Sequence, residues 1–405
     1  MIHVCYGLHD ETGRYSKFVG TSMLSMFENH SRPASITVHL LHDDTLTLDN
    51  YEKFVYLAGQ YNQQIRFYNM EKICAETISA FREVIPTGLS IGATFRLLIF
   101  QVLSPQIDKV IYLDADTIVN LDIQELWQID LGDKPFGGVA EVDNGVNTQQ
   151  LFAICRDKVV KDEDYINSGV WLMNLAQLRK NKDVIENGVE FIIAHPQYAY
   201  FDQDIFNYCF GAQALRLPTK FNRFPIRIKD RTEKAVERNL YHYAGHPLQL
   251  NMRDAFNRLY FDYFTKTQWF NADTLGNIFD DVRAIYLERQ NIMAIVSAAV
   301  ASKRRIFVTE PNNVELVRKI FYVKDNEEIL KIDSPNWIGN LIARMKNSAG
   351  EKIYFLLVGN LVYPQLREML IKEGFTEWQD FLNGEIFLSE LHGVPLDSFR
   401  LIYKM

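Results

Sequence analysis

The sequence has few cysteines and places none of them in a spacing typical of metal or redox sites. Its 405 residues include four cysteines, and no two of them form a C-x-x-C pair. This scatter argues against a disulfide framework and against a zinc site. A reducing compartment therefore fits the cysteine usage best.

The sequence also lacks an excess of positive charge and a long hydrophobic run. The net charge is −8, whereas proteins that bind nucleic acid usually show a basic excess, so we expect no nucleic-acid partner. The longest weakly polar run, 293-MAIVSAAVA-301, is far shorter than the ~20 residues that cross a bilayer. Met1 leads directly into a strand-like segment and not into a signal peptide. We expect a cytoplasmic protein, with peripheral contact at the inner face of a membrane left open.

The first half of the chain alternates strand-like and helix-like segments. Hydrophobic residues make up 47% of the chain and charged residues 23%, the balance of a globular protein. The apolar spacing predicts strands at 2–7, 35–41, 63–70, 109–116 and 165–175, and helices at 16–30, from about residue 47, at 93–103 and at 254–264. This rhythm predicts an α/β fold with an open sheet flanked by helices.

The alternation restarts near the C-terminus. Strands are predicted at 304–310, 352–359 and 385–391, and helices at 314–321 and 363–375. We expect a linker near 285–300, so that residues 1–285 form the main domain and 286–405 a small α/β accessory domain of unknown role.

Two carboxylates end one of the most apolar strands, in 110-VIYLDADTIVN-120. On a strand, Asp114 and Asp116 would point to the same face, at the carboxyl edge where open α/β sheets bind ligands. Paired acids repel each other, and a hard divalent cation such as Mg²⁺ or Mn²⁺ relieves that repulsion. An acidic, solvated turn is an equally common reason for a D-x-D sequence.

A second interpretation of the pair is a metal-dependent phosphatase. Haloacid-dehalogenase-like phosphatases carry an apolar strand followed by D-x-D-x-T/V, in which the first acid, here Asp114, is the nucleophile. The segment from Asp114 to Ile118 is one residue off that pattern. More than a hundred residues precede it here, whereas the phosphatase motif usually opens the chain.

Four motifs in order resemble glycosyltransferase family 8, the retaining bacterial galactosyl- and glucosyltransferases and their glycogenin relatives. They are YLDADT at 112–117, YINSGV at 165–170 with MNL at 173–175, FDQD at 201–204 and HYAG at 242–245. The similarity covers about residues 2–265. It implies a GT-A nucleotide-diphospho-sugar transferase fold, a Mn²⁺ or Mg²⁺ ion, a UDP-sugar donor and transfer with retention.

The resemblance also implies a role for individual residues. The expected metal ligands are Asp114, Asp116 and His242. The expected donor-binding residues are Gly7, Asp10, Arg96, Asp114, Ala115, Asn167, Gly169 and Gly245. The expected catalytic residues are Gln203, close to the anomeric carbon in a front-face attack, and Asp202, which would hold a donor hydroxyl or simply cap a helix.

The chain departs from the family pattern at two places. Many members carry K-P-W soon after the histidine motif, and this chain reads HYAGHPLQLNMRD there. Either Arg253 or His246 replaces the lysine, or the chain binds its donor more weakly. The nucleotide loop, 6-YGLHDETGRY-15, is longer than the usual A-x-D-D-N-Y, which bears on the uracil contact expected of Asp10. The basic and aromatic stretch 216–231 is expected to be a solvated loop in preference to part of an acceptor groove.

The leading hypothesis is therefore a metal-dependent retaining hexosyltransferase. It would move glucose or galactose from a UDP-sugar to a surface glycan or a lipid-linked saccharide. The phosphatase, and a degenerate protein that binds nucleotide sugars without turnover, are the alternatives. Donor sugar, acceptor, the role of the accessory domain and the oligomeric state do not follow from the sequence.

Overall fold

The chain divides into two compact units, Met1–Ala272 and Asp273–Met405. The computed structural model describes residues 1–31, 35–86, 89–244, 252–280, 283, 303–321, 323–333, 336–348, 351–358 and 363–384. The expected domain boundary at 285 and 286, and the apolar run 293–301, lie outside these residues. Of the described helices, none is long and apolar enough to span a bilayer.

The first unit is built on a mixed seven-stranded sheet in the order β3-β2-β1-β4-β7-β6-β8. The strands are β1 (Ile2–Leu8), β2 (Ile36–His42), β3 (Gln64–Asn69), β4 (Lys109–Leu113), β6 (Phe136–Ala140), β7 (Ile166–Asn174) and β8 (Leu215–Arg216). The first four strands run parallel to one another, and β7 is antiparallel to both β4 and β6. Strand β7 therefore starts at the edge where β1 and β4 end.

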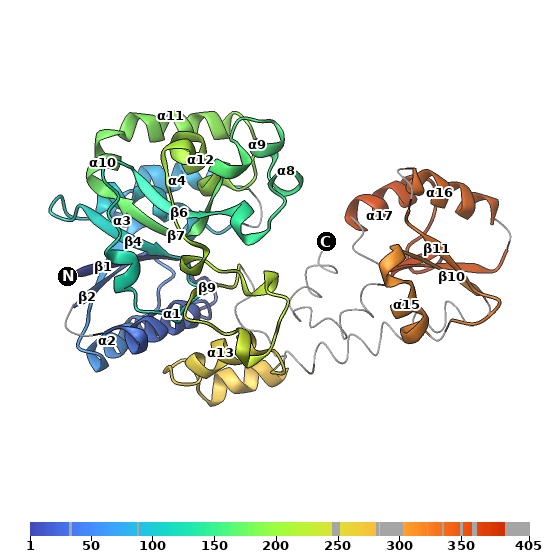
Figure 1. Cartoon of the computed structure of the whole chain (residues 1–405), viewed down its shortest axis with the longest axis horizontal. Coiled ribbons are helices and arrows are strands. Elements are labelled where there is room, and N and C mark those ends of the chain that lie inside the picture. Colours follow the sequence, from blue (N-terminus) through green and yellow to red (C-terminus); the bar gives the residue numbers. More distant parts are fainter. Residues whose placement is uncertain are drawn as a thin grey trace. The chain divides into compact units, whose positions relative to one another are not determined.

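Helices cover both faces of this sheet, as the sequence predicts (Figure 1). On one side lie α1 (Ser16–Asn29), α2 (Leu48–Gln60) and α13 (Ala255–Phe264). On the other lie α4 (Ala75–Val84), α10 (Leu175–Lys180), α11 (Lys182–Ile193) and α12 (Phe201–Phe210). Helix α2 begins with a threonine N-cap, because the side chain of Thr47 accepts a hydrogen bond from the backbone N–H of Asn50.

The helix predicted at 93–103 is broken in the structure. It consists of α5 (Ile91–Thr94), a 3₁₀ turn at Phe95–Leu98 and α6 (Ile99–Val102). Within this segment the carbonyl of Ala93 accepts a hydrogen bond from Nε of Arg96 at 2.9 Å.

The second unit carries a parallel four-stranded sheet in the order β11-β10-β12-β13. Its strands are β10 (Arg304–Thr309), β11 (Glu328–Lys331), β12 (Ile353–Leu357) and β13 (Phe381–Asn383), and its helices include α15 (Val314–Phe321), α16 (Trp337–Asn347) and α17 (Tyr363–Lys372). The predicted strands at 304–310 and 352–359 and the two predicted helices are confirmed. Strands β11 and β13 and helix α16 were not predicted, and the strand predicted at 385–391 lies outside the described residues.

Candidate active site

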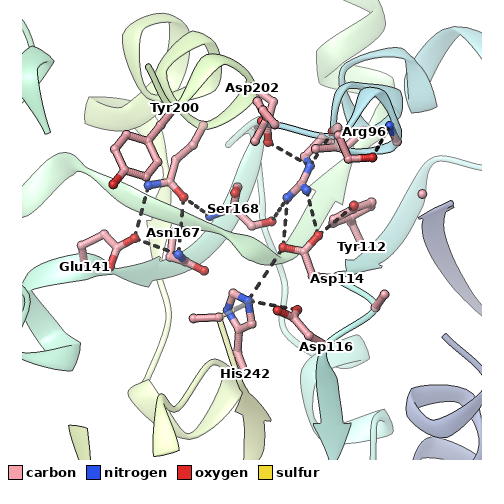
Figure 2. A pocket seen from close by; sticks show the side chains of 18 of the residues that line it. Arg96, Tyr112, Asp114, Asp116, Glu141, Asn167, Ser168, Tyr200, Asp202 and His242 are labelled. Atoms are coloured by element: carbon pink, nitrogen blue, oxygen red, sulfur yellow. Dashed lines mark hydrogen bonds and ion pairs between the residues drawn. The ribbon is translucent and has the colours of Figure 1, made fainter. Parts of the chain in front are cut away.

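A cavity of about 550 Å³ opens at the sheet edge where β1 and β4 end. Most of the residues expected in the site line it, and Figure 2 shows several of them converging on its floor. They are Gly7, Arg96, Asp114, Ala115, Asp116, Asn167, Asp202, Gln203 and His242. The structure thus brings together residues that stand more than two hundred positions apart in the sequence.

The two acids meet in a turn and not on a strand, so the prediction that they share one strand face is wrong. Strand β4 ends at Leu113, and residues 114–116 turn the chain into the short strand β5 (Thr117–Val119). Thr117 closes the turn, since its Oγ1 donates to the carbonyl of Asp114 at 2.8 Å. Two acids in a tight turn can face one centre as readily as two acids on a strand.

The turn also brings the histidine to the acids. Strand β5 pairs antiparallel with β9 (Leu240–His242), and in this register Thr117 lies opposite His242. The N–H of Tyr243 donates to the carbonyl of Asp116 at 2.9 Å, which fixes β9 against the turn. The backbone pairing therefore sets the position of the histidine side chain.

Asp114, Asp116 and His242 each offer a ligand atom, and these atoms lie within 4.8 Å of one another. Nε2 of His242 is 3.3 Å from Oδ1 of Asp116 and 3.8 Å from Oδ2 of Asp114. Burial lowers the pKa of His242, but the charges of the two aspartates outweigh this effect and raise it. Two carboxylates and one imidazole nitrogen, largely shielded from water, match the ligands of a divalent cation such as Mn²⁺.

Arg96 supplies the balancing cation (Figure 2). Its Nη2 is 2.8 Å from Oδ1 of Asp114, and its Nε is 3.0 Å from Oδ2 of Asp202. Nη1 donates to the carbonyl of Ser168 at 2.6 Å, and the guanidinium group lies 4.4 Å from the centre of the Tyr112 ring. Arg96 is 3% exposed, so this charge is directed into the cavity and not toward solvent.

Asp202 and Gln203 lie in the first turn of α12, but Asp202 does not cap the helix. Tyr200 is the N-cap residue and makes no side-chain capping hydrogen bond, while Oδ2 of Asp204 accepts a hydrogen bond from the backbone N–H of Tyr200 at 3.0 Å. The alternative interpretation of Asp202 as a helix cap is therefore wrong. Burial raises the pKa of Asp202 to about 6, although the charge of Arg96 opposes this shift.

Glu141, at the end of β6, is a site residue that the sequence analysis missed. Its Oε1 accepts hydrogen bonds from Nδ2 of Asn167 at 2.8 Å and from Nε2 of Gln203 at 3.2 Å. Burial raises the pKa of Glu141. The segment 136-FGGVAE-141 has the same pattern as the segment before Asp114, an apolar strand that ends in an acid, so the signal was present in the sequence.

Two expected site residues, Asp10 and Gly169, do not line the cavity, and a third is not described. Asp10 is not among the residues that line the cavity, and its carboxylate accepts hydrogen bonds from the backbone N–H groups of Tyr15 and Ser16. Gly169 lies behind His242, and a Cβ atom there would be 2.2 Å from Cε1 of the imidazole. Gly245, like the candidate lysine substitute His246, is outside the described residues.

The basic and aromatic stretch 216–231 is not simply a solvated loop. Phe224, Ile226 and Arg227 line the same cavity as the acidic cluster. Phe224 is 5% exposed and Ile226 is 65% exposed, so the stretch runs from the protein interior to the mouth of the cavity. The segment therefore forms part of the cavity wall.

Comparison with known proteins identifies the family. Residues 5–247 match the family described as glycosyl transferase family 8. This chain belongs to that family. Its sequence is 28% identical over 261 residues to a lipopolysaccharide 1,2-glucosyltransferase of Escherichia coli K12, a match that covers 60% of this chain and 71% of the relative.

Solved structures confirm the expected GT-A fold of this family 8 member. The galactosyltransferase LgtC, in complex with donor and acceptor sugar analogues, superposes with a TM-score of 0.53 at 22% identity over 68% of this chain and 99% of that chain. The WbbM bifunctional glycosyltransferase gives a TM-score of 0.50 at 19% identity, over 66% of this chain and half, 50%, of that chain. The chain is thus a family 8 glycosyltransferase with an open mixed sheet flanked by helices.

Proposed function

We propose that the chain is a metal-dependent, retaining hexosyltransferase that moves glucose or galactose from a UDP-sugar to a saccharide acceptor. The observation that carries this proposal is the cluster of Asp114, Asp116 and His242 in the same cavity as Arg96 and Gln203. The names of the two similar enzymes, a lipopolysaccharide glucosyltransferase and a galactosyltransferase, support a hexose donor and a cell-surface or lipid-linked saccharide as acceptor.

The cluster fits a divalent cation better than it fits a metal-free salt bridge. Oxygen atoms of two carboxylates and Nε2 of His242 converge on one centre, and a metal-free cluster would need a proton on that nitrogen to offset the acids. A bound Mn²⁺ or Mg²⁺ ion would offset the negative charge of the diphosphate leaving group. Arg96 would add a fixed positive charge beside it.

The surroundings of Gln203 favour a front-face reaction over a covalent intermediate. Its amide oxygen accepts a hydrogen bond from the N–H of Ser168 at 2.8 Å, while its Nε2 donates to Glu141. An amide held at both ends is a weak nucleophile, yet its oxygen can stabilise positive charge at the anomeric carbon. Asp202, held by Arg96, would orient a hydroxyl group of the donor sugar.

Release of nucleoside diphosphate tests this proposal without knowledge of the acceptor. Purified protein is incubated with Mn²⁺ and a panel of nucleotide sugars, and free nucleoside diphosphate is measured. We expect slow release of UDP from UDP-glucose or UDP-galactose, lost on addition of EDTA and reduced at least 100-fold in Asp116→Asn. Binding without release in the presence of candidate acceptors would indicate the degenerate protein, and absence of any Mn²⁺-dependent binding would overturn the proposal.

Asp122→Asn is the matched control. Asp122 follows β5 and also pairs with a histidine, since Nδ1 of His30 lies 3.1 Å from its Oδ1, but it does not line the cavity. We expect UDP release by this variant to stay within twofold of the wild-type rate. Release of inorganic phosphate from phosphate esters, lost in Asp114→Asn, would instead support the phosphatase, which family membership disfavours.

A further inference from the structure

A continuous row of buried polar side chains links the histidine of the cluster to Gln203. Nδ1 of His242 is 3.1 Å from Oδ1 of Asn222, and Nδ2 of Asn222 is 2.8 Å from Oδ1 of Asn167. Asn167 in turn donates to Glu141, which also accepts from Gln203. Asn222 is 0% exposed and has no place among the residues expected from the sequence.

The direction of the hydrogen bonds between Asn167 and His242 follows from two groups that contact the Asn167 amide, the N–H of Gly169 and the carboxylate of Glu141. The backbone N–H of Gly169 can only donate, and it lies 2.9 Å from Oδ1 of Asn167, so that atom is an oxygen. The other end of the Asn167 amide faces the acceptor Glu141, as an NH₂ group must. Asn222 therefore turns its own NH₂ group to Asn167 and its oxygen to His242.

This direction determines the proton position on the imidazole ring. Because Oδ1 of Asn222 accepts, Nδ1 of His242 has to carry the proton that it donates. Nε2 is then the nitrogen whose lone pair is available on the side of Asp114 and Asp116. The ring has little freedom to turn. Phe224 packs edge-on against it, with the ring centres 5.3 Å apart, and the backbone of Gly169 lies so close that a Cβ atom there would overlap the imidazole.

We propose that Asn222 is the positioning residue of the metal site. It holds His242 in the tautomer that presents Nε2 to the cation, and with its NH₂ group it orients Asn167 on the side of Gln203. This inference rests on the proposed function, because the tautomer matters for catalysis only if a cation binds at the cluster. Such hydrogen-bonding partners of metal ligands typically change metal affinity by 10- to 100-fold.

Two variants of the full chain separate the two contacts of Asn222. Asn222→Leu removes both, and we expect a 10- to 100-fold weaker affinity for Mn²⁺, measured by electron paramagnetic resonance with UDP present. Asn222→Asp keeps an acceptor for Nδ1–H but sets an oxygen against Oδ1 of Asn167. We expect its Mn²⁺ affinity to stay within threefold of wild type, while the KM for the UDP-sugar rises about tenfold.

A direct measurement of the tautomer gives a second readout. The chain has nine histidines, so selective ¹⁵N labelling followed by nuclear magnetic resonance resolves the ring of His242 through its loss in His242→Gln. In metal-free wild-type protein, at a pH where the ring is neutral, we expect the proton on Nδ1. Asn222→Leu should lose this preference, whereas Asn222→Asp should keep it.

Asn239→Leu controls for a merely structural effect. Asn239 is also a buried asparagine, one residue before β9, and its Nδ2 donates to the hydroxyl group of Tyr241 and not to His242. It should unfold at a lower temperature with unchanged Mn²⁺ affinity and tautomer. An Nε2-protonated ring in the wild type, or equal Mn²⁺ affinity in Asn222→Leu and wild type, would overturn the proposal. Wild-type protein that binds no Mn²⁺ but shows the Nδ1–H tautomer would refute the metal-dependent function and leave the assignment of the proton intact.

Discussion

At the scale of single residues, the site depends on side chains that are each held from several directions. Arg96 contacts two carboxylates and two carbonyls, and Gln203 is bound at both ends of its amide. Groups held in this way keep their geometry as a substrate enters. They can therefore stabilise charge in the transition state without first being reordered. The same restraint makes the site sensitive to small steric changes.

Gly169→Ala is the sharpest steric test of the site. The new Cβ atom would lie 2.2 Å from Cε1 of His242, so the imidazole ring has to leave the position in which Nε2 faces the two acids. We expect at least tenfold weaker Mn²⁺ binding and a similar loss of UDP release. Gly59→Ala is the control, because a Cβ at Gly59 in α2 meets nothing within 4 Å. That variant should gain roughly 0.5–1 kcal/mol of stability at unchanged Mn²⁺ affinity, and equal Mn²⁺ affinity in both variants would contradict the cluster as the metal site.

Sequence motifs predict which residues enter the site but not what orients them. Asp114, Asp116 and His242 stand in recognisable patterns, and they do come together. Asn222 carries no local signal, because its partners lie at residues 167 and 242 and only the folded chain brings them within hydrogen-bond distance. Supporting contacts of this kind become visible only when the fold is known.

At the scale of secondary structure elements, a residue that the sequence assigned to the site instead holds a helix in place. Asp10 is the clearest case, because its buried carboxylate accepts hydrogen bonds at the start of α1 from the N–H groups of Tyr15 and Ser16 and from Nδ2 of Asn50. A negative charge at a helix N-terminus is favourable, and burial of the donors makes its loss costly. The uracil contact expected of Asp10 remains a hypothesis.

Asp10→Ala decides between these two roles. We expect the free energy of unfolding to fall by about 2–4 kcal/mol, because several donors at the start of α1 lose a charged acceptor. Chemical denaturation measures this loss. The KM for the UDP-sugar should change less than threefold at a temperature where the variant is folded, and a large rise in KM with little loss of stability would establish the uracil contact instead.

Helix α12 gives stability a pH dependence. Asp204 accepts hydrogen bonds from the hydroxyl group of Tyr165 and the N–H of Tyr200, yet burial raises its pKa to about 6 from the ordinary value of 3.8. Between these two values the folded chain keeps a proton that the unfolded chain has lost. The contribution of protonated Asp204 to the free energy of unfolding is therefore complete below about pH 4, and it disappears as the pH rises through about 6.

Comparison with Asp204→Asn isolates this effect. Urea unfolding of metal-free protein between pH 4 and pH 7 should show wild-type stability falling relative to the variant by up to about 3 kcal/mol. Asp202, whose pKa is also raised to about 6, is present in both proteins and largely cancels in the difference. Parallel stability curves for the two proteins would show that Asp204 is ionised in the folded chain throughout this range.

The elements themselves were largely predictable, and the failures have physical causes. The apolar strands β1, β2 and β4 and the helices α1 and α2 lie where the periodicity places them. The segment 93–103 contains a 3₁₀ turn at Phe95–Leu98 between α5 and α6, which apolar spacing alone does not distinguish from a continuous α-helix. The acids after β4 turn because Thr117 closes a local hydrogen bond, which alternation of side chains does not reveal.

At the scale of the whole molecule, the described site belongs to one of the two units. Among the described residues, all that line the cavity lie between Gly7 and Ala244, within the unit Met1–Ala272. The family match also ends inside that unit, at residue 247. The second unit has its own parallel sheet and its own hydrophobic core, so its contribution to donor binding is expected to be small.

A fragment of residues 1–272 tests whether the first unit alone is sufficient for donor binding. Because every described residue that lines the cavity or packs in the core around it lies in that unit, we expect the fragment to fold and to bind Mn²⁺ and UDP within threefold of the full chain. It should also release UDP from the UDP-sugar at a similar rate. Transfer to a saccharide acceptor is measured in parallel, and a selective loss of transfer would assign acceptor recognition to the second unit. A folded fragment that no longer binds UDP would show instead that residues beyond 272 complete the donor site.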